Sequence, residues 1–242
     1  FLQQHIFTPV GMAGTRYNAD HLQPGDNAAV GHAKYDFKAL RTVAPLTWSN
    51  NAGAGGIYSS VHDMARWMNV QLAHGTLENG TALFSAKSQQ GMWQMITPQV
   101  VPEPSVPQLA AARPNFAGYG EGWSLSDYRG QKLVWHTGGW PGMVSRVTLV
   151  PEQKLGIVVL TNQEVGAAFN AITMKVLDTY LADSGTDWLA AYQAQVAQAR
   201  GDADAHWQKL QAARDATSKP SLPLAKYAGT LRDPWYGDVV VA

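Results

Sequence analysis

Cysteine is absent from all 242 residues of the chain. Its absence excludes disulfide bonds, catalysis by a cysteine thiolate and zinc sites built from cysteine. The seven histidines show no His-Glu-x-x-His pattern or comparable ligand spacing, so a metal site is not expected either. We therefore expect neither a metal nor another cofactor.

An excess of charge of one sign is also missing. The chain has 18 basic and 18 acidic residues spread along its length, and its formal net charge is zero. A nucleic-acid-binding protein normally carries a basic patch or stripe, so nucleic acid is not an expected partner. No apolar run approaches the ~18 residues that a membrane-spanning helix needs, so we expect no membrane span in this chain.

Apolar residues, by contrast, make up 45% of the chain, which is typical of a globular protein. At this length the chain can form one large domain or two, with a sizeable core. Tryptophans such as Trp48, Trp93 and Trp123 are expected mostly in that core. The first residue, Phe1, lies within an amphipathic stretch and the last residues, GDVVVA, lie within a strand pattern. Both ends are therefore expected to be interior points of a longer protein.

The spacing of apolar residues predicts helices and strands in alternation along the chain. Phe1–Phe7 is predicted to be the end of a helix stopped by Pro9 and Gly11. Residues 13–56 show little periodicity and predict a long irregular excursion, which in a compact domain is more often functional than accidental. The further helices are predicted over 61–72, 85–96, 167–181 and 187–214, the last with a break at Gly201-Asp202.

Four strand patterns follow one another with short connectors. They cover 119–128, 131–136, 143–150 and 155–161, and the connectors contain glycine or proline. Such connectors favour an antiparallel meander. The fold class expected is therefore mixed α/β (α+β), with an antiparallel sheet flanked by helices.

The stretch WHTGGWPG at residues 135–142 ends one of these strands. Glycine weakens a strand, so Gly138 and Gly139 suggest that another group approaches the backbone closely. Acyl transfer fits this pattern, because the negative oxygen that develops must be held by donors placed in advance. Thr137 adds a hydroxyl, and His136 can donate a hydrogen bond or shuttle a proton. A plain hairpin with a half-exposed His136 is the alternative that this stretch leaves open.

Four blocks together resemble one enzyme family. They are FLQQHIFTPVGM (1–12), AGGIYSSVHDMARWM (54–68), YGEGW (119–123) and HTGGWPGMVSRVTLVPEQKLGIVVLTN (136–162). Their order and spacing are similar to those of penicillin-binding-protein-like serine hydrolases. This family includes class C β-lactamases, D-alanyl-D-alanine carboxypeptidases, D-aminopeptidases and related esterases. The resemblance implies a β-lactamase/transpeptidase-like fold that is incomplete at the N-terminus.

The resemblance also implies roles for individual residues. His136, Thr137 and Gly138 match the three-residue motif that lines the family's active-site cleft. Gly139 matches the position whose backbone N–H forms half of the oxyanion hole. Asn162 matches an asparagine near the substrate carboxylate, and Trp140, beside the motif, is a candidate wall of the cleft. The partner implied is a small-molecule or peptide acyl substrate, and the location implied is periplasmic or secreted.

The resemblance divides the chain into three parts. Residues 1–183 would be the C-terminal part of the hydrolase domain, and residues 184–218 a helical connector. Residues 219–242 resemble the start of a truncated accessory β domain, through the segment at Tyr227-Ala228-Gly229 and a second one at Tyr236-Gly237.

Two motifs of the family are missing from the chain. No lysine has a serine three residues before it, so the Ser-x-x-Lys motif that carries the nucleophile is absent, as is the Tyr-x-Asn motif. Both precede the first block in the family and are expected upstream of Phe1, on a missing N-terminal segment of the same protein. Ser49-Asn50-Asn51 spells Ser-x-Asn but follows that block, and we interpret it as a loop coincidence.

The sequence thus predicts a serine hydrolase for the full-length protein, acting through an acyl-enzyme, and a chain that is inactive by itself. Histidine in place of the family's more familiar lysine is a weaker anchor for a carboxylate. It favours an esterase, D-aminopeptidase or broad peptidase, with D-Ala-D-Ala carboxypeptidase-like activity also open, over a dedicated β-lactamase. The alternatives are a non-catalytic ligand-binding or sensor protein and an inactive fragment.

Overall fold

The structure is a computed structural model that describes residues 1–34, 39–47 and 49–242, so Trp48 lies outside the described residues. Its centre is a six-stranded antiparallel sheet in the order β3-β4-β5-β6-β7-β8. The strands are β3 (Thr97–Gln99), β4 (Ala117–Tyr119), β5 (Ser124–Tyr128), β6 (Gln131–Trp140), β7 (Met143–Val150) and β8 (Leu155–Thr161). The mixed α/β fold class with an antiparallel meander is confirmed.

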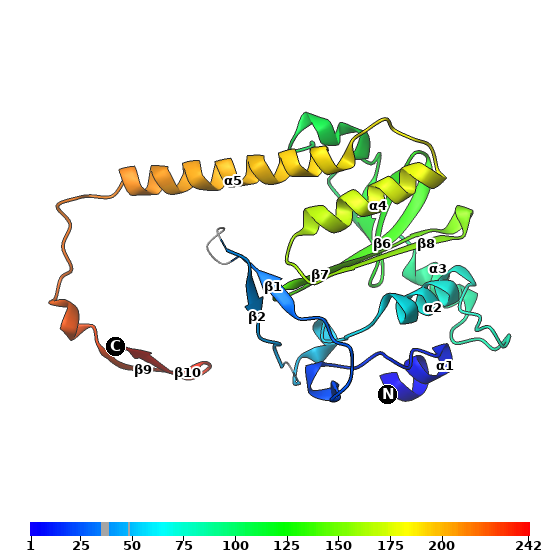
Figure 1. Ribbon diagram of the computed structural model, residues 1–242, viewed down its shortest axis with the longest axis horizontal. Helices are drawn as coiled ribbons and strands as arrows, with labels where there is room; N and C mark the ends of the chain where they lie inside the picture. The colour runs from blue at the N-terminus through cyan, green and yellow to red at the C-terminus, as the bar shows by residue number, and fades with distance from the viewer. Residues whose placement is uncertain (35–38, 48) are drawn as a thin grey trace. The chain divides into compact units, whose positions relative to one another are not determined.

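Helices cover both faces of this sheet (Figure 1). On one face, α4 (Gly166–Tyr180) and the start of α5 (Trp188–Ala212) pack against strand residues such as Leu133 and Val159. On the other face, α2 (Val61–Leu72) packs against residues such as Leu149. Successive strand residues point to opposite faces, so these two apolar layers come from alternating positions.

Helix α2 forms where the sequence predicts it. The Ser60 side chain accepts a hydrogen bond from the Asp63 N–H at 3.2 Å, which satisfies one of the free donors at the helix start. The Asp63 carboxylate is buried and accepts bonds from Gly14 N–H at 2.9 Å and Thr15 Oγ1 at 2.8 Å. The helix start therefore also anchors the beginning of the irregular excursion.

The described residues of the excursion form short elements only. They are η2 (Ala19–His21), β1 (Gly31–Ala33), β2 (Arg41–Val43) and η3 (Ala52–Ala54), and β1 pairs with β2. The remaining short helices of the first compact unit, Phe1–Gln198, are η1 (Gln3–Phe7), α1 (Thr8–Val10), α3 (Ala86–Met92), η4 (Pro107–Ala112) and η5 (Pro151–Gln153).

Pro9 does not end the first helix, contrary to the prediction. It lies inside the helical run that η1 and α1 form together, and its fixed φ is compatible with that run. The helix ends at Gly11, whose φ of 77° lies in the left-handed region.

The predicted strand 119–128 is two strands. Gly120 N–H bonds to the Trp123 carbonyl at 2.8 Å, and the chain turns between β4 and β5 with Gly122 at a φ of 77°. A Cβ at Gly120 would lie 2.3 Å from the Met92 carbonyl oxygen, so the turn packs backbone against backbone. The helix predicted over 85–96 ends earlier, at Met92, whose carbonyl contacts this turn.

Two further predictions are wrong at particular glycines. β6 continues to Trp140 instead of ending at His136, because Gly138 and Gly139 pair with Ser145 and Val144 of β7. α5 runs through Gly201 without a break. One glycine costs a helix about 1 kcal/mol, and the surrounding alanine, glutamine and arginine residues favour helix.

The chain divides into two compact units, Phe1–Gln198 and Ala199–Ala242. The second contains the end of α5, η6 (Leu224–Lys226) and a hairpin of β9 (Gly229–Asp233) and β10 (Gly237–Val241). The three-part division at residues 183 and 218 stays a prediction. Among the described residues, no helix is both long and apolar enough to cross a bilayer.

Candidate active site

The candidate site is built on the half of β6 that has a neighbour on one side only. β5 pairs with β6 over Gln131–Trp135, whereas β7 pairs with it from Val134 to Trp140. Within the described part of the chain, the segment from His136 to Gly139 therefore has a free edge where β5 has ended. The four residues predicted to be catalytic all lie on this segment.

The hairpin turn decides which backbone groups face this free edge. Trp140 and Met143 flank the two-residue turn Pro141-Gly142 and form the closing pair of the ladder. Opposed residues in an antiparallel pair alternate between exchanging both hydrogen bonds and exchanging none. The alternation leaves Thr137 and Gly139 with their N–H and C=O groups directed away from β7. These are the groups that an approaching substrate would meet.

His136 is exposed, and both nitrogens of its ring have a partner. Nδ1 lies 2.7 Å from the Thr137 carbonyl oxygen, and Nε2 lies 3.0 Å from the hydroxyl of Tyr119 on β4. The two rings meet edge to face, with centroids 5.9 Å apart. The sequence analysis placed Tyr119 in the YGEGW block but gave it no role. Its proximity to His136 arises from pairing across three strands, which no local pattern encodes.

The two glycines of the motif have different surroundings. A methyl group at Gly138 would lie 2.6 Å from Ser145 Oγ, the hydroxyl of its partner on β7. A methyl group at Gly139 would meet nothing within 4 Å among the described residues beyond its chain neighbours. Gly139 is also exposed, so its backbone is accessible to an incoming group.

A buried cation lies on the opposite face, behind the site. Arg146 pairs with Thr137 and points toward α4, where its Nη1 donates to Asn170 Oδ1 at 2.7 Å. Its guanidinium stacks 4.3 Å from the centre of the Trp135 ring. Burial lowers the pKa of Arg146 to about 10, and Tyr192 partly opposes this shift. The sequence predicted no role for Arg146.

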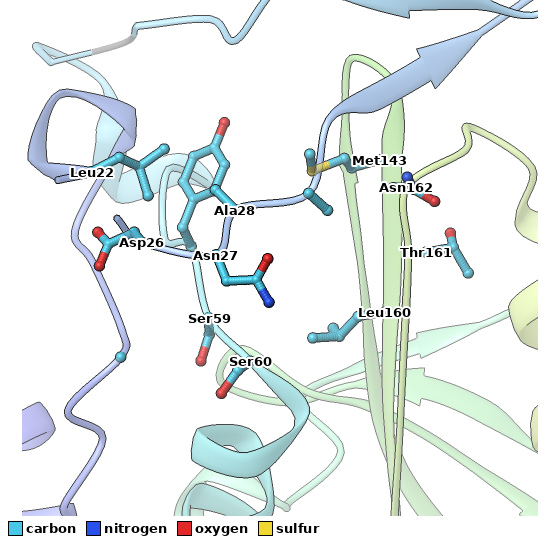
Figure 2. Close-up of a pocket in the computed structure, with 13 residues that line it drawn as sticks. Leu22, Asp26, Asn27, Ala28, Ser59, Ser60, Met143, Leu160, Thr161 and Asn162 are labelled. Atoms are coloured by element: carbon cyan, nitrogen blue, oxygen red, sulfur yellow. The ribbon is translucent and has the colours of Figure 1, made fainter. Parts of the chain in front are cut away.

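A cavity of about 640 Å³ adjoins the end of the β6–β7 hairpin (Figure 2). Ser59 and Ser60 at the start of α2, Asn27 of the excursion and Leu160 of β8 line it. Leu160 pairs with Ser145, which pairs with Gly138, so the cavity lies on the same face as His136.

Asn162 lines this cavity, and His136, Thr137, Gly138 and Gly139 are not among its lining residues. The Asn162 side chain donates to the Val30 carbonyl at 3.0 Å, so its amide N–H group also fastens the excursion to the end of β8. The structure thus places Asn162 at the same end of the sheet as the β6 motif, but not in contact with the free edge.

Trp140 lies at the end of β6 and connects to the cavity through Tyr58. Burial raises the pKa of Tyr58, and the Trp140 side chain partly opposes this effect. Tyr58 itself lines the cavity. Trp140 therefore lies beside a residue of the wall, and the sequence predicted no role for Tyr58.

Other candidates stay outside this arrangement. Ser49-Asn50-Asn51 lies in a loop, and Ser49 donates to Asp20 Oδ2 at 2.5 Å. No group of three or more His, Cys, Asp or Glu residues in the described part of the chain is placed to bind a metal ion.

Comparison with known proteins gives consistent matches. The sequence model of the family described as Beta-lactamase matches residues 1–181. An unguisins hydrolase of Aspergillus violaceofuscus (strain CBS 115571) is 27% identical over 97% of this chain and 44% of its own length. The chain thus spans less than half of this relative.

Solved structures share the fold. The octameric penicillin-binding protein homologue from Pyrococcus abyssi superposes with a TM-score of 0.60 at 21% identity, over 78% of this chain and 39% of that one. A D-stereospecific amidohydrolase from Streptomyces sp. gives a TM-score of 0.52 at 16% identity, over 76% of this chain and 48% of that one.

Proposed function

The chain belongs to the Beta-lactamase family, and on this premise we propose that the full-length protein is a serine acyl hydrolase. It would cleave amide or ester bonds through an acyl-enzyme, as an esterase, D-aminopeptidase or D-Ala-D-Ala carboxypeptidase-like enzyme. Residues 1–242 contain no Ser-x-x-Lys motif. The nucleophilic serine, its lysine and a supporting tyrosine would come from a segment of the same protein outside these residues.

One observation carries the proposal: Gly139 is exposed, and its backbone N–H lies at the free edge of β6. A serine hydroxyl that attacks a carbonyl creates an oxyanion, and donors fixed in advance stabilise this charge more than the neutral ground state. The Gly139 N–H would supply one donor. The lysine would accept the serine proton, the leaving group would depart with a proton, and water would then hydrolyse the ester to the serine.

The surroundings of Gly139 support a substrate that pairs with β6 through its backbone. The edge presents the N–H and C=O groups of alternate residues, and an extended backbone can pair with such an edge. The cavity on the His136 face offers room for a side chain of the substrate. His136 and Thr137 would orient the substrate and relay protons.

Histidine at position 136 favours an esterase, D-aminopeptidase or broad peptidase over a dedicated β-lactamase. A lysine there would be a permanent cation for a substrate carboxylate, whereas an imidazole is a weaker anchor. The matched fungal relative is named as a hydrolase of unguisins, which supports hydrolysis as the reaction class.

Labelling of the full-length protein with a fluorophosphonate probe tests the proposal. We expect an intact-mass increase of one adduct, and peptide mapping should place it on a serine outside residues 1–242. His136→Ala should slow labelling and ester hydrolysis, whereas His206→Ala, at an exposed position of α5, should not. The absence of an adduct would contradict the proposal. An adduct without turnover of ester or D-peptide substrates would favour a ligand-binding or sensor protein.

A further inference from the structure

The two hydrogen bonds of His136 indicate which nitrogen of its neutral ring carries the hydrogen. A carbonyl oxygen can only accept, so the contact at 2.7 Å with the Thr137 carbonyl requires the hydrogen on Nδ1. In the neutral ring Nε2 then carries the lone pair, and the Tyr119 hydroxyl at 3.0 Å donates to it. Both contacts agree with a single tautomer and fix the ring from two sides.

This position of the ring occupies part of the free edge. The Thr137 carbonyl is one of the groups that β7 leaves outward-facing, and the His136 Nδ1–H already bonds to it. An extended peptide laid along β6 would need the outward groups of both Thr137 and Gly139. With the imidazole in place, only Gly139 still offers both its N–H and its C=O group for pairing.

We propose that Tyr119 is a specificity-determining positioning residue, whose hydroxyl holds the His136 ring over the Thr137 carbonyl and so limits backbone pairing to Gly139. The inference rests on the proposed hydrolase function. It defines the substrate class as compounds with a short acyl part, which need one pairing position beside the scissile bond. Long extended peptides are disfavoured, because they must displace the imidazole to pair further along the strand.

The experiment compares two substrates with the same leaving group on the full-length protein. The p-nitrophenyl esters of N-acetyl-alanine and of N-acetyl-tetra-alanine differ only in the length of the acyl part. Removing the hydroxyl in Tyr119→Phe releases the ring and frees one backbone acceptor. The ratio of kcat/KM for the long ester over the short ester should then rise about two- to tenfold, the value of one hydrogen bond. Tyr180→Phe is the matched control, because Tyr180 is 65% exposed and lies at the end of α4.

An unchanged or lower ratio in active Tyr119→Phe protein would overturn the inference. If the wild type hydrolyses neither ester, the result counts against the proposed function. A second measurement, which needs no turnover, then tests whether Tyr119 positions the His136 ring. Two-bond ¹H–¹⁵N correlation spectra of the neutral ring should show His136 with its hydrogen on Nδ1 in the wild type. In Tyr119→Phe the Nε2–H form should become populated. A wild-type ring with its hydrogen on Nε2, or a variant ring unchanged from the wild type, would overturn the positioning role.

Discussion

Gly139 contributes to the candidate site through its N–H group, and its missing side chain is of less consequence. The N–H faces the free edge of β6 and has no ladder partner there in the described part of the chain. A methyl group at this position meets nothing within 4 Å beyond the chain neighbours. The donor and the side chain can therefore be tested separately at one position.

We expect Gly139→Pro to lower the rate of serine acylation by about 10²–10³-fold, the usual effect of losing one oxyanion donor. Proline is tolerated on strand edges where no N–H is needed, so the fold should persist. Stopped-flow acylation with a p-nitrophenyl ester measures the rate, and a thermal unfolding curve checks the fold. Gly139→Ala is the control and should retain most of the activity, because it keeps the N–H. Equal losses in the two variants would contradict the role of the donor.

At the scale of elements, the β6–β7 hairpin is fixed at its turn by a second segment. Gly142 has a left-handed φ of 78°, and its N–H lies 3.3 Å from Glu164 Oε2. The His32 N–H of β1 bonds to the Gly142 carbonyl at 2.9 Å. A Cβ at Gly142 would lie 2.6 Å from the His32 nitrogen and 2.7 Å from the Gly31 carbonyl carbon. The excursion and the site hairpin thus meet backbone against backbone.

Gly142→Ala should therefore lower the free energy of unfolding by about 2–4 kcal/mol, from the left-handed conformation and the backbone clash together. Gly130→Ala is the matched control. Gly130 occupies the same place in the β5–β6 turn with a φ of 73°, but a Cβ there meets nothing within 4 Å. It should cost only the conformational part, about 1–2 kcal/mol. Urea unfolding of the full-length variants measures both values, and equal losses would show that β1 does not press on the turn.

The elements that follow local patterns could be predicted from the sequence. The helix over 61–72 and the two strands 143–150 and 155–161 agree with the structure, because each is specified by residues close in the chain. The boundaries that failed depend on distant contacts. The Met92 carbonyl packs on Gly120 and separates β4 from β5, and β7 extends β6 through two glycines.

The candidate site divides in the same way. Its motif on β6 is contiguous, so His136 to Gly139 could be recognised as one unit in the sequence. Tyr119 and Tyr58 could not be assigned, because each reaches the site from another part of the fold. For Asn162, the sequence predicted the position but not the contact. Its place at the end of β8 followed from the sequence, but its bond to Val30 joins residues far apart in the chain.

At the scale of the whole molecule, three tyrosines have pKa values raised mainly by burial. Tyr58 lies at the cavity, whereas Tyr128 on β5 and Tyr192 on α5 belong to the same buried cluster. The carboxylate of Asp178 adds to the shift of Tyr128, and Arg146 partly opposes that of Tyr192. Each phenol is held neutral in the folded protein at a pH where the same phenol ionises in the unfolded chain.

The free energy of unfolding should consequently fall as the pH rises above about 10, the pKa of tyrosine in an unfolded chain. Below that pH the phenols are neutral in both states, and their contribution to the free energy of unfolding is fully present. This contribution is lost as the pH rises through the raised pKa values of the folded state. Arg146 acts in the opposite direction, because its pKa is lowered from 12.5 to about 10 and the folded state releases its proton first. Tyr227 acts in the same direction as Arg146, because hydrogen bonds with Ser221 and Leu222 lower its pKa. Three phenols with raised pKa values against one guanidinium and one phenol with lowered values predict a net fall. Urea unfolding of the full-length protein at pH 8.5, 9.5 and 10.5, with tyrosinate absorbance at 295 nm, measures it. Tyr192→Phe should make the fall shallower, since one phenol is removed and Arg146 remains, and a stability that is constant or rises over this range would contradict the argument.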